Sequence, residues 1–432
     1  MQISVDFHHV IGSIKPVHSV CDPPYYGCSL SCLPYLKQAG IPYARLHDIG
    51  MSGYSRKWVD IHHIFPDFSA DATDPDSYDF AFTDCLINAL IEQGIEPLFR
   101  LGTSIENDAA IKAYHIYPPA DYEKWAVVCE HIIRHYTEGW AGGFHHTITY
   151  WEIWNEPDNE EDPMLNQMWR GNKEQYYALY GVTSRHLKKC FPHLKIGGYG
   201  SCGFYHLLNA EVEGTAASLR TAYFIEFLDG FLAYVRENDC PLDFFSWHSY
   251  DSIPNNRQYA AYARKRLNEA GFLHTELICD EWNNEFRRRS TYEHAALTCG
   301  MLLAFQNSPV DMACFYDAQI SAGPYSGLFD PCSYLPYPAY YAFVAFQRLY
   351  RLGKQVALTA DTDALCAVAA TDGGKGCIVI ANPTAEVMPL TIHGNGQVHS
   401  CSLTADGQIE VPTALPSVLP PYSFLSVLLD VE

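Results

Sequence analysis

The sequence predicts a (β/α)₈ barrel followed by a small antiparallel β-domain. Between Ile3 and Tyr350, eight short apolar, β-rich runs alternate with helical stretches. After Gly353 the helical period is lost. The chain has 432 residues, of which 48% are apolar and 18% charged. That composition suits a large globular core and about two domains.

The eight β-rich runs are nearly continuous in apolar residues, as expected for parallel strands covered on both faces. They are Ile3–Phe7, Tyr43–His47, Glu96–Leu101, Ile148–Asn155, Lys195–Tyr199, Phe244–Tyr250, Glu276–Trp282 and Met312–Asp317. A doubly wound sheet is the alternative, but no Gly-x-Gly-x-x-Gly motif follows the first run. We therefore expect residues 1–350 to form the barrel.

The stretches between these runs show the period of a helix. Within Tyr78–Gln93, apolar residues recur at i, i+3, i+4, i+7 and i+8, and Gly94 follows, a residue that commonly ends helices. Asp121–Tyr136 repeats the pattern directly after Pro118-Pro119, which cannot interrupt it there. Such helices are expected to cover the outside of the barrel.

Residues 354–432 contain only short β-rich runs, separated by turns such as Asp372-Gly373-Gly374. This pattern predicts an antiparallel β-sandwich as a second domain. The runs are few for a full sandwich, which leaves room for a strand contributed by the N-terminal residues.

The composition excludes several classes of function. A net charge of −22 disfavours nucleic acid and anionic membranes as partners, and no apolar run approaches the ~20 residues of a membrane span. The segment Met1–Pro16 has no basic flank and no apolar stretch of secretory length. The fifteen cysteines are scattered and odd in number, which indicates reduced thiols. Together these features predict a cytoplasmic protein.

Two acidic motifs lie where a barrel places its catalytic groups, at the C-terminal ends of strands. The fourth run ends in Trp154-Asn155-Glu156-Pro157 and the seventh in Asp280-Glu281-Trp282-Asn283. A single Glu at a strand end is commonly solvated or ion-paired. Two acids across a barrel mouth, each flanked by Trp and Asn, instead suit retaining glycoside hydrolysis, in which one carboxyl protonates the leaving oxygen and the other attacks the anomeric carbon.

These motifs carry a resemblance to a known family. Trp151–Asp158 resembles the acid/base strand of the retaining clan A glycoside hydrolases, and Asp280–Asn283 resembles their nucleophile motif. More narrowly, the chain is similar to glycoside hydrolase family 39, which holds β-xylosidases and α-L-iduronidases. Gly94–Pro97, Phe245–Tyr250 and Pro338–Tyr341 extend the similarity, which spans roughly residues 40–350.

The resemblance implies a role for each matching residue. Glu156 would be the general acid/base and Glu281 the nucleophile. The other implied groups surround the sugar and the nucleophile. Asn155 would hydrogen-bond the 2-hydroxyl of the sugar, Tyr250 and Arg45 would lie beside Glu281, and His47 and His248 would line the sugar pocket. From its position beside a carboxyl, Trp282 is an expected platform for the sugar ring. Because two carboxyls supply the chemistry, no cofactor and no metal is expected.

Several neighbouring residues are expected to be structural. Glu152 falls one layer below the pocket, and Asp280 should face away from Glu281 as a contact between barrel and helix. The third predicted strand departs from the family in Phe99–Thr103, which leaves the sugar less determined than the chemistry. Arg287–Arg289 is a basic triplet expected to lie on a helix face or an interface. Alternatively it would suit an acidic sugar, for which Arg45 and Arg100 are the other arginines near strand ends.

The sequence thus predicts a retaining exo-glycosidase, with a β-xylosidase acting on short oligosaccharides as the first expectation. The alternatives are another specificity of the same clan, such as an arabinosidase or iduronidase, and a catalytically silent sugar-binding barrel. The expected partner is a small oligosaccharide or glycoside. The sequence is also compatible with assembly into a homo-oligomer.

Overall fold

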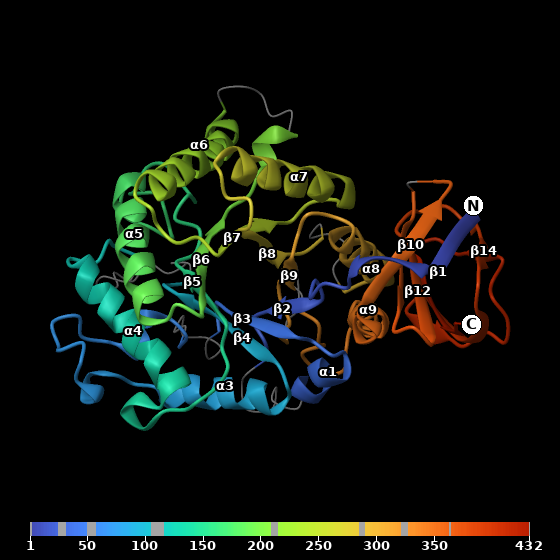
Figure 1. Ribbon diagram of the computed structural model, residues 1–432, viewed down its shortest axis with the longest axis horizontal. Helices are drawn as coiled ribbons and strands as arrows, with labels where there is room; N and C mark the ends of the chain where they lie inside the picture. Colours follow the sequence, from blue (N-terminus) through green and yellow to red (C-terminus); the bar gives the residue numbers. More distant parts are fainter. Residues whose placement is uncertain are drawn as a thin grey trace.

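The computed structural model describes residues 2–24, 32–49, 58–104, 116–208, 215–284, 290–320, 327–362 and 364–431. These residues form a closed parallel barrel ringed by helices and, beside it, an eight-stranded sheet that is mostly antiparallel (Figure 1). The predicted fold class is therefore confirmed. No helix within these ranges is both long and apolar enough to cross a membrane.

The barrel strands follow one another in chain order, and β2 closes the ring by pairing with both β3 and β9. Nearly all of their residues are buried, because helices cover the outer face and side chains fill the inner one. The strands are β2 (Ser19–Cys21), β3 (Tyr43–Leu46), β4 (Glu96–Leu101), β5 (Tyr150–Ile153), β6 (Lys195–Ser201), β7 (Phe244–Ser249), β8 (Glu276–Trp282) and β9 (Met312–Phe315).

The prediction of the first barrel strand was wrong. Ile3–Phe7 belongs to β1 (Gln2–Ser13), which pairs with β10 (Lys354–Ala360) in the second sheet. Alternate residues of Ile3–Phe7 are buried and exposed, the pattern of a strand covered on one face only. The first barrel strand is instead β2, whose three residues are too few to show a pattern in the sequence.

Helices surround the barrel, and α8 and α9 lie between it and the second sheet (Figure 1). Their ends follow ordinary capping chemistry: Asp121 accepts a hydrogen bond from the Lys124 amide to begin α4, and left-handed Gly139 ends it. The helices are α1 (Leu33–Gln38), α2 (Ile61–Ile64), α3 (Ala81–Glu92), α4 (Tyr122–Glu138), α5 (Lys173–Cys190), α6 (Ala216–Glu237), α7 (Ile253–Glu269), α8 (Tyr292–Gln306) and α9 (Tyr340–Leu352).

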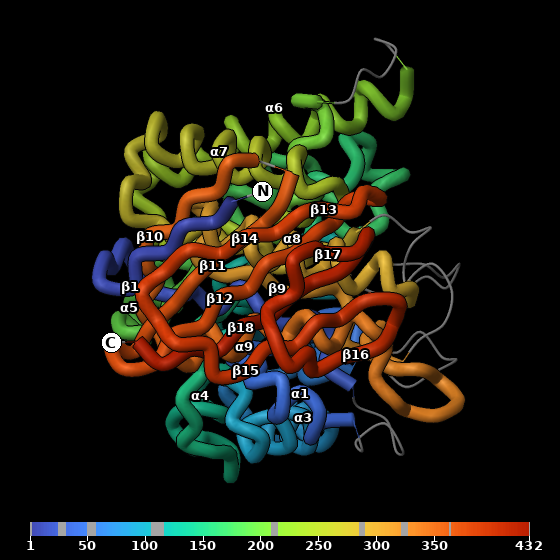
Figure 2. The backbone as a smooth tube through the Cα atoms, turned by 90° about the vertical axis from the view of Figure 1, so that its right-hand side faces the viewer, coloured from blue at the N-terminus to red at the C-terminus, as the bar shows by residue number. Residues whose placement is uncertain are grey.

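The second sheet has the strand order β14-β1-β10-β11-β12-β18-β15-β16, and β13 pairs with β17 in a separate ribbon. Figure 2 shows the blue β1 lying among the orange and red strands of the C-terminal region. Only the pairing of β1 with β14 is parallel. The strands not yet given are β11 (Cys366–Thr371), β12 (Lys375–Asn382), β13 (Met388–Pro389), β14 (Thr391–Gly394), β15 (Gln397–Ala405), β16 (Gln408–Glu410), β17 (Val418–Leu419) and β18 (Ser423–Asp430).

The second sheet shares its core with the barrel. Along β12, Cys377 and Val379 belong to the apolar core that includes the barrel helices, whereas Ile378 and Ile380 belong to the core within the sheet domain. Both faces of this strand are therefore buried. The two units are joined by apolar packing through α8 and α9.

Replacing a buried residue of β1 should destabilise this sheet. Phe7 is 2% exposed and packs so closely that a Cβ added to Gly376 would lie 2.6 Å from its ring. We expect Phe7→Ala to lower the free energy of unfolding by about 3–5 kcal/mol. His9→Ala, at an exposed position of β1, should change it by less than about 0.5 kcal/mol. Urea unfolding measures both, and equal effects would contradict the assignment of β1.

Candidate active site

The two carboxyls singled out in the sequence lie close together at the mouth of the barrel. Glu156 follows β5 and Glu281 lies in β8. One carboxylate oxygen of each, together with a ring nitrogen of His248, lies within 4.8 Å of the others. Retaining glycosidases separate their two carboxyls by about 5–5.5 Å and inverting ones by about 6.5–9.5 Å. The arrangement here therefore has the spacing of a retaining site.

The backbone turns sharply where it presents Glu156. Trp154 and Glu156 have φ angles of 75° and 44°, in the left-handed region that non-glycine residues rarely adopt, at a cost of about 1–3 kcal/mol each. Packing holds the turn: the fully buried Trp154 ring donates a hydrogen bond to the Met168 carbonyl, and the Glu156 amide donates to Gly200. This turn lets Asn155 and Glu156 both contact the residues of the barrel centre.

A β-bulge presents the second acid. Trp247 of β7 pairs with Cys279 of β8, but the next residue, His248, pairs with Glu281. Asp280 is thus an extra residue that breaks the alternation of side chains. Both Asp280 and Glu281 consequently contact Arg45 inside the barrel. The prediction that Asp280 faces outward as a contact with a helix was wrong.

Arg45 connects most of the predicted site. Its side chain is fully buried, and its guanidinium lies 2.8 Å from Glu152, 2.8 Å from Asp280 and 3.3 Å from Glu281. Nη2 also donates to the Asn155 side-chain oxygen at 2.5 Å, which leaves the amide nitrogen of Asn155 free to face a ligand. One cation therefore orients three carboxyls and one amide.

The pKa values of Asp280 and Glu152, which lie beneath the two catalytic candidates, shift in opposite directions. Burial raises the pKa of Asp280 well above its usual value, and the Glu152 carboxylate adds to the shift although Arg45 opposes it. Burial also opposes charge on Glu152, but Arg45 and hydrogen bonds from Asp280 and Ser246 bring the pKa of Glu152 below its usual value. Folding therefore favours the proton on Asp280 and the negative charge on Glu152.

His248 lies between the two catalytic candidates. Its Nδ1 donates to Glu156 Oε1 at 2.8 Å and lies 3.7 Å from Glu281 Oε2. Burial lowers the pKa of His248, but the charge on Glu281 and the hydrogen bond and charge of Glu156 outweigh burial and raise it to about 9. The imidazole is therefore protonated at neutral pH.

The pKa values of the two carboxyls shift in opposite directions. Burial opposes charge on Glu156, but the hydrogen bond and charge of His248 hold its pKa below the usual value. Burial raises the pKa of Glu281, and the charge on Glu156 adds to the effect, against His248, Arg45 and the Tyr250 hydroxyl. The hydrogen bond from His248 Nδ1 therefore places a proton beside Glu156.

The remaining predicted groups lie around this centre, with one exception. The Tyr250 hydroxyl donates a short hydrogen bond to Glu281. Burial, reinforced by Arg45 and Arg100, lowers the pKa of His47 well below its usual value, so this imidazole is neutral. Trp282 is the exception: it is fully buried against Phe305 of α8 and Phe315 of β9. Its ring therefore offers no face to a sugar.

The arginines considered for an acidic sugar are not available to one in the described part of the chain. Arg100 is fully buried and pairs with Asp60 at 2.5 Å, while Ser104 contacts both side chains. Arg45 already faces carboxyls. Arg287–Arg289 lies outside the described residues.

Sequence reasoning missed two supports of the site. Asn159 donates to Glu156 Oε2 at 3.0 Å from the loop after β5, and Ser246 donates to Glu152 at 2.5 Å from β7. Ser246 lies two residues before His248 and so faces the same side of its strand, a signal that could have identified it. Asn159 lies in a loop, where no periodicity indicates a direction.

Replacing Asp280 by Asn should remove a pH dependence of stability. A carboxyl whose pKa is raised by folding binds its proton more tightly in the folded state, so stability falls as pH rises above the unfolded value. Between pH 5 and 7, Asp280→Asn should therefore gain up to about 1.4 kcal/mol per pH unit over the wild type. Urea unfolding at several pH values measures this, with the exposed Asp361→Asn as control. A pH-independent difference would show that Asp280 is charged.

Comparisons with known proteins agree with this geometry. Residues 41–292, more than half of the chain, match the family model described as glycosyl hydrolases family 39. A β-xylosidase from Geobacillus stearothermophilus is 23% identical over 349 residues, which cover 71% of this chain and 64% of the relative. The chain thus spans slightly less than two thirds of that protein.

Solved structures show the same fold. A glucosidase from Croceicoccus marinus superposes with a TM-score of 0.74 at 22% identity, covering 100% of this chain and 99% of the other. A family 39 β-xylosidase from Caulobacter crescentus superposes with a TM-score of 0.69 at 18% identity over 100% of both chains. With the matched family model and the paired carboxyls at the barrel mouth, this chain belongs to family 39 of the glycosyl hydrolases.

Proposed function

We propose that the chain is a retaining exo-acting glycosidase in which Glu281 is the nucleophile and Glu156 the acid/base. The observation that carries the proposal is the pair of carboxyls whose oxygens lie within 4.8 Å at the ends of β5 and β8. Such spacing leaves no room for a water molecule to attack in line with a departing aglycone, so the second carboxyl must attack instead.

In the first step, a Glu281 oxygen bonds to the anomeric carbon while the leaving oxygen takes a proton from Glu156. The proton comes from the His248–Glu156 hydrogen bond: transfer from Nδ1 to Oε1 converts the ion pair into a neutral acid and a neutral imidazole. Arg45 and the Tyr250 hydroxyl stabilise the ionised form of Glu281 before attack. In the second step, Glu156 removes a proton from water, which displaces Glu281 with overall retention.

The preferred sugar in this proposal is neutral, with β-xylose first. The buried arginines at the described strand ends already face carboxylates, and a uronate needs an available, preferably bidentate, arginine. The β-xylosidases from Geobacillus stearothermophilus and Caulobacter crescentus support a xyloside. Neutral His47 and the free amide nitrogen of Asn155 suit hydroxyl groups.

A silent sugar-binding barrel is the alternative from another class. Against it stand the protonated His248 placed on Glu156 and the Tyr250 hydroxyl placed on Glu281. A protein that only binds sugar would not need to hold a proton beside one of two closely spaced carboxyls.

Substitution of each carboxyl should separate their roles. Glu281→Ala should abolish activity, and azide should partly restore it and give the inverted glycosyl azide. Glu156→Ala should still form the glycosyl-enzyme from aryl glycosides with good leaving groups, because these need no proton. NMR of the first wild-type product should show retention. An inverted first product would contradict the assigned roles, and no product from any glycoside would favour the silent barrel.

The charge of the sugar should determine how efficiently a glycoside is hydrolysed. We expect kcat/KM for nitrophenyl β-xyloside to exceed that for the glucuronide and iduronide by at least about 100-fold, because an unpaired uronate would be desolvated beside carboxylates. The α-L-arabinoside and β-glucoside complete the panel as neutral comparisons. Preference for a uronide, lost in Arg100→Ala, would overturn the proposed sugar class.

A further inference from the structure

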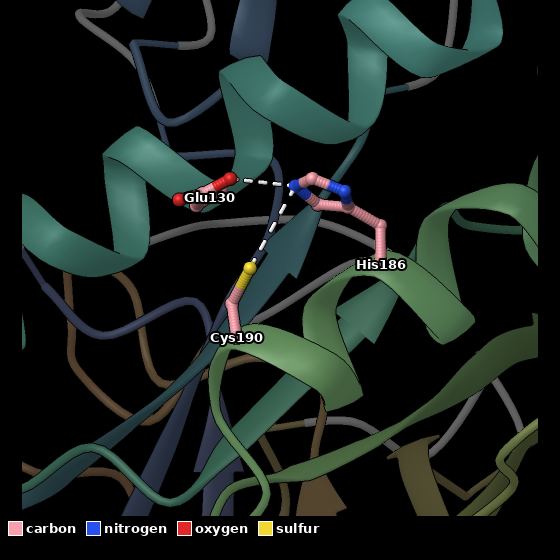
Figure 3. Close-up of side chains that lie close together, drawn as sticks. All are labelled: Glu130, His186 and Cys190. Carbon is pink, nitrogen blue, oxygen red and sulfur yellow. Dashed lines mark hydrogen bonds and ion pairs between the residues drawn. The ribbon is translucent and has the colours of Figure 1, made fainter.

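A second group of metal-ligating side chains lies outside the barrel, between α4 and α5. Figure 3 shows Glu130 of α4 and Cys190 of α5 both directed at the ring of His186. Glu130 Oε2 lies 2.6 Å and Cys190 Sγ 3.9 Å from His186 Nε2. One ligand atom from each residue lies within 4.8 Å of the other two.

The helices hold these three side chains in place. His186 and Cys190 are four residues apart on α5 and so share one helix face. Arg134 donates to the other oxygen of Glu130 at 2.7 Å, and its guanidinium is held in turn by Glu138 and lies over the Phe191 ring. Arg134 thereby orients Glu130 so that Oε2 faces His186, as second-shell partners orient metal ligands.

The distances suit a tetrahedral metal after small movements. With zinc bond lengths of about 2.0–2.3 Å, ligand atoms lie about 3.3–3.6 Å apart. The nitrogen–oxygen pair would open by less than about 1 Å, the nitrogen–sulfur pair would close by a few tenths, and the oxygen–sulfur pair, which lies within 4.8 Å, would close by at most about 1.5 Å. The cluster is half-buried, which leaves solvent access for a metal ion and for water as a fourth ligand.

The charges also suit a dication. A bound dication would stabilise the thiolate, as metals do for coordinating cysteines. Together, one carboxylate, one thiolate and one neutral imidazole balance its two charges.

We propose that Glu130, His186 and Cys190 form a zinc site that joins α4 to α5 on the outside of the barrel. The mixed oxygen, nitrogen and sulfur ligands match a borderline metal such as Zn²⁺ and not Mg²⁺ or Ca²⁺, which take oxygen ligands. Binding displaces the thiol proton to water, and the neutral imidazole binds through Nε2 with its one ring proton on Nδ1. The site takes no part in the glycosidase chemistry and stabilises the fold.

Cobalt provides the test, because Co²⁺ bound to a thiolate gives a charge-transfer absorption band that oxygen and nitrogen ligands do not give. We expect the full chain, reduced with a phosphine, to show this band with one equivalent of Co²⁺ and to lose it when Zn²⁺ is added. Zn²⁺ alone should raise Tm by about 1–3 °C. Glu156, His248 and Glu281 are the other cluster of ligand-type atoms in the described ranges, and they contain no sulfur.

Variants assign the band to the proposed residues. Cys190→Ser should remove it, and Glu130→Gln should weaken Co²⁺ affinity by at least about tenfold. Cys85→Ser is the matched control, because Cys85 is an exposed cysteine on α3 outside the cluster, and it should leave the band unchanged. No band in the wild type, a band that survives in Cys190→Ser, or unchanged affinity in Glu130→Gln would each overturn the proposal.

Discussion

The buried guanidinium of Arg45 is the interaction on which the centre of the barrel depends. Its guanidinium contacts Glu152 near the end of β5 and Asn155 in the turn that follows. It also contacts Asp280 and Glu281 in β8. A buried charge without a partner is strongly destabilising, by about 3–5 kcal/mol when one member of such a pair is removed. The positions of both catalytic candidates are therefore tied to one side chain of β3 that does not itself react.

Below this guanidinium the barrel is filled with apolar side chains. Leu98, Phe244 and Ile278 belong to an interior cluster that also contains Met312 of β9. The polar groups of Arg45, Glu152 and Asp280 rest on this layer, and the catalytic candidates come next toward the strand ends. Because these lower layers exclude water, the charge interactions above them are strengthened. The single guanidinium of Arg45 can therefore order several carboxyls.

Much of this arrangement was accessible from the sequence, and the exceptions have physical causes. The runs from Tyr43 onward are continuously apolar because helices cover those strands. Since these runs mark where each strand ends, the two Glu motifs could be placed at strand ends. The period-2 alternation could not reveal the bulge at Asp280, since one extra residue reverses every side chain after it. Trp282 was misplaced because its position beside a carboxyl in the sequence suggested a sugar platform, whereas the residue after Glu281 faces the other side of the strand, toward α8. The pairing of β1 with β10 joins residues more than 340 positions apart, a contact that no local pattern encodes.

That long-range pairing has a consequence for how the chain is made. Ribosomes add about 5–20 residues per second, so β1 leaves the ribosome roughly 20–70 s before β10 exists to pair with it. During that interval the alternating apolar residues Ile3, Val5 and Phe7 form an uncovered strand edge and face. The apolar face of β1 therefore stays uncovered on the nascent chain until β10 has been synthesised.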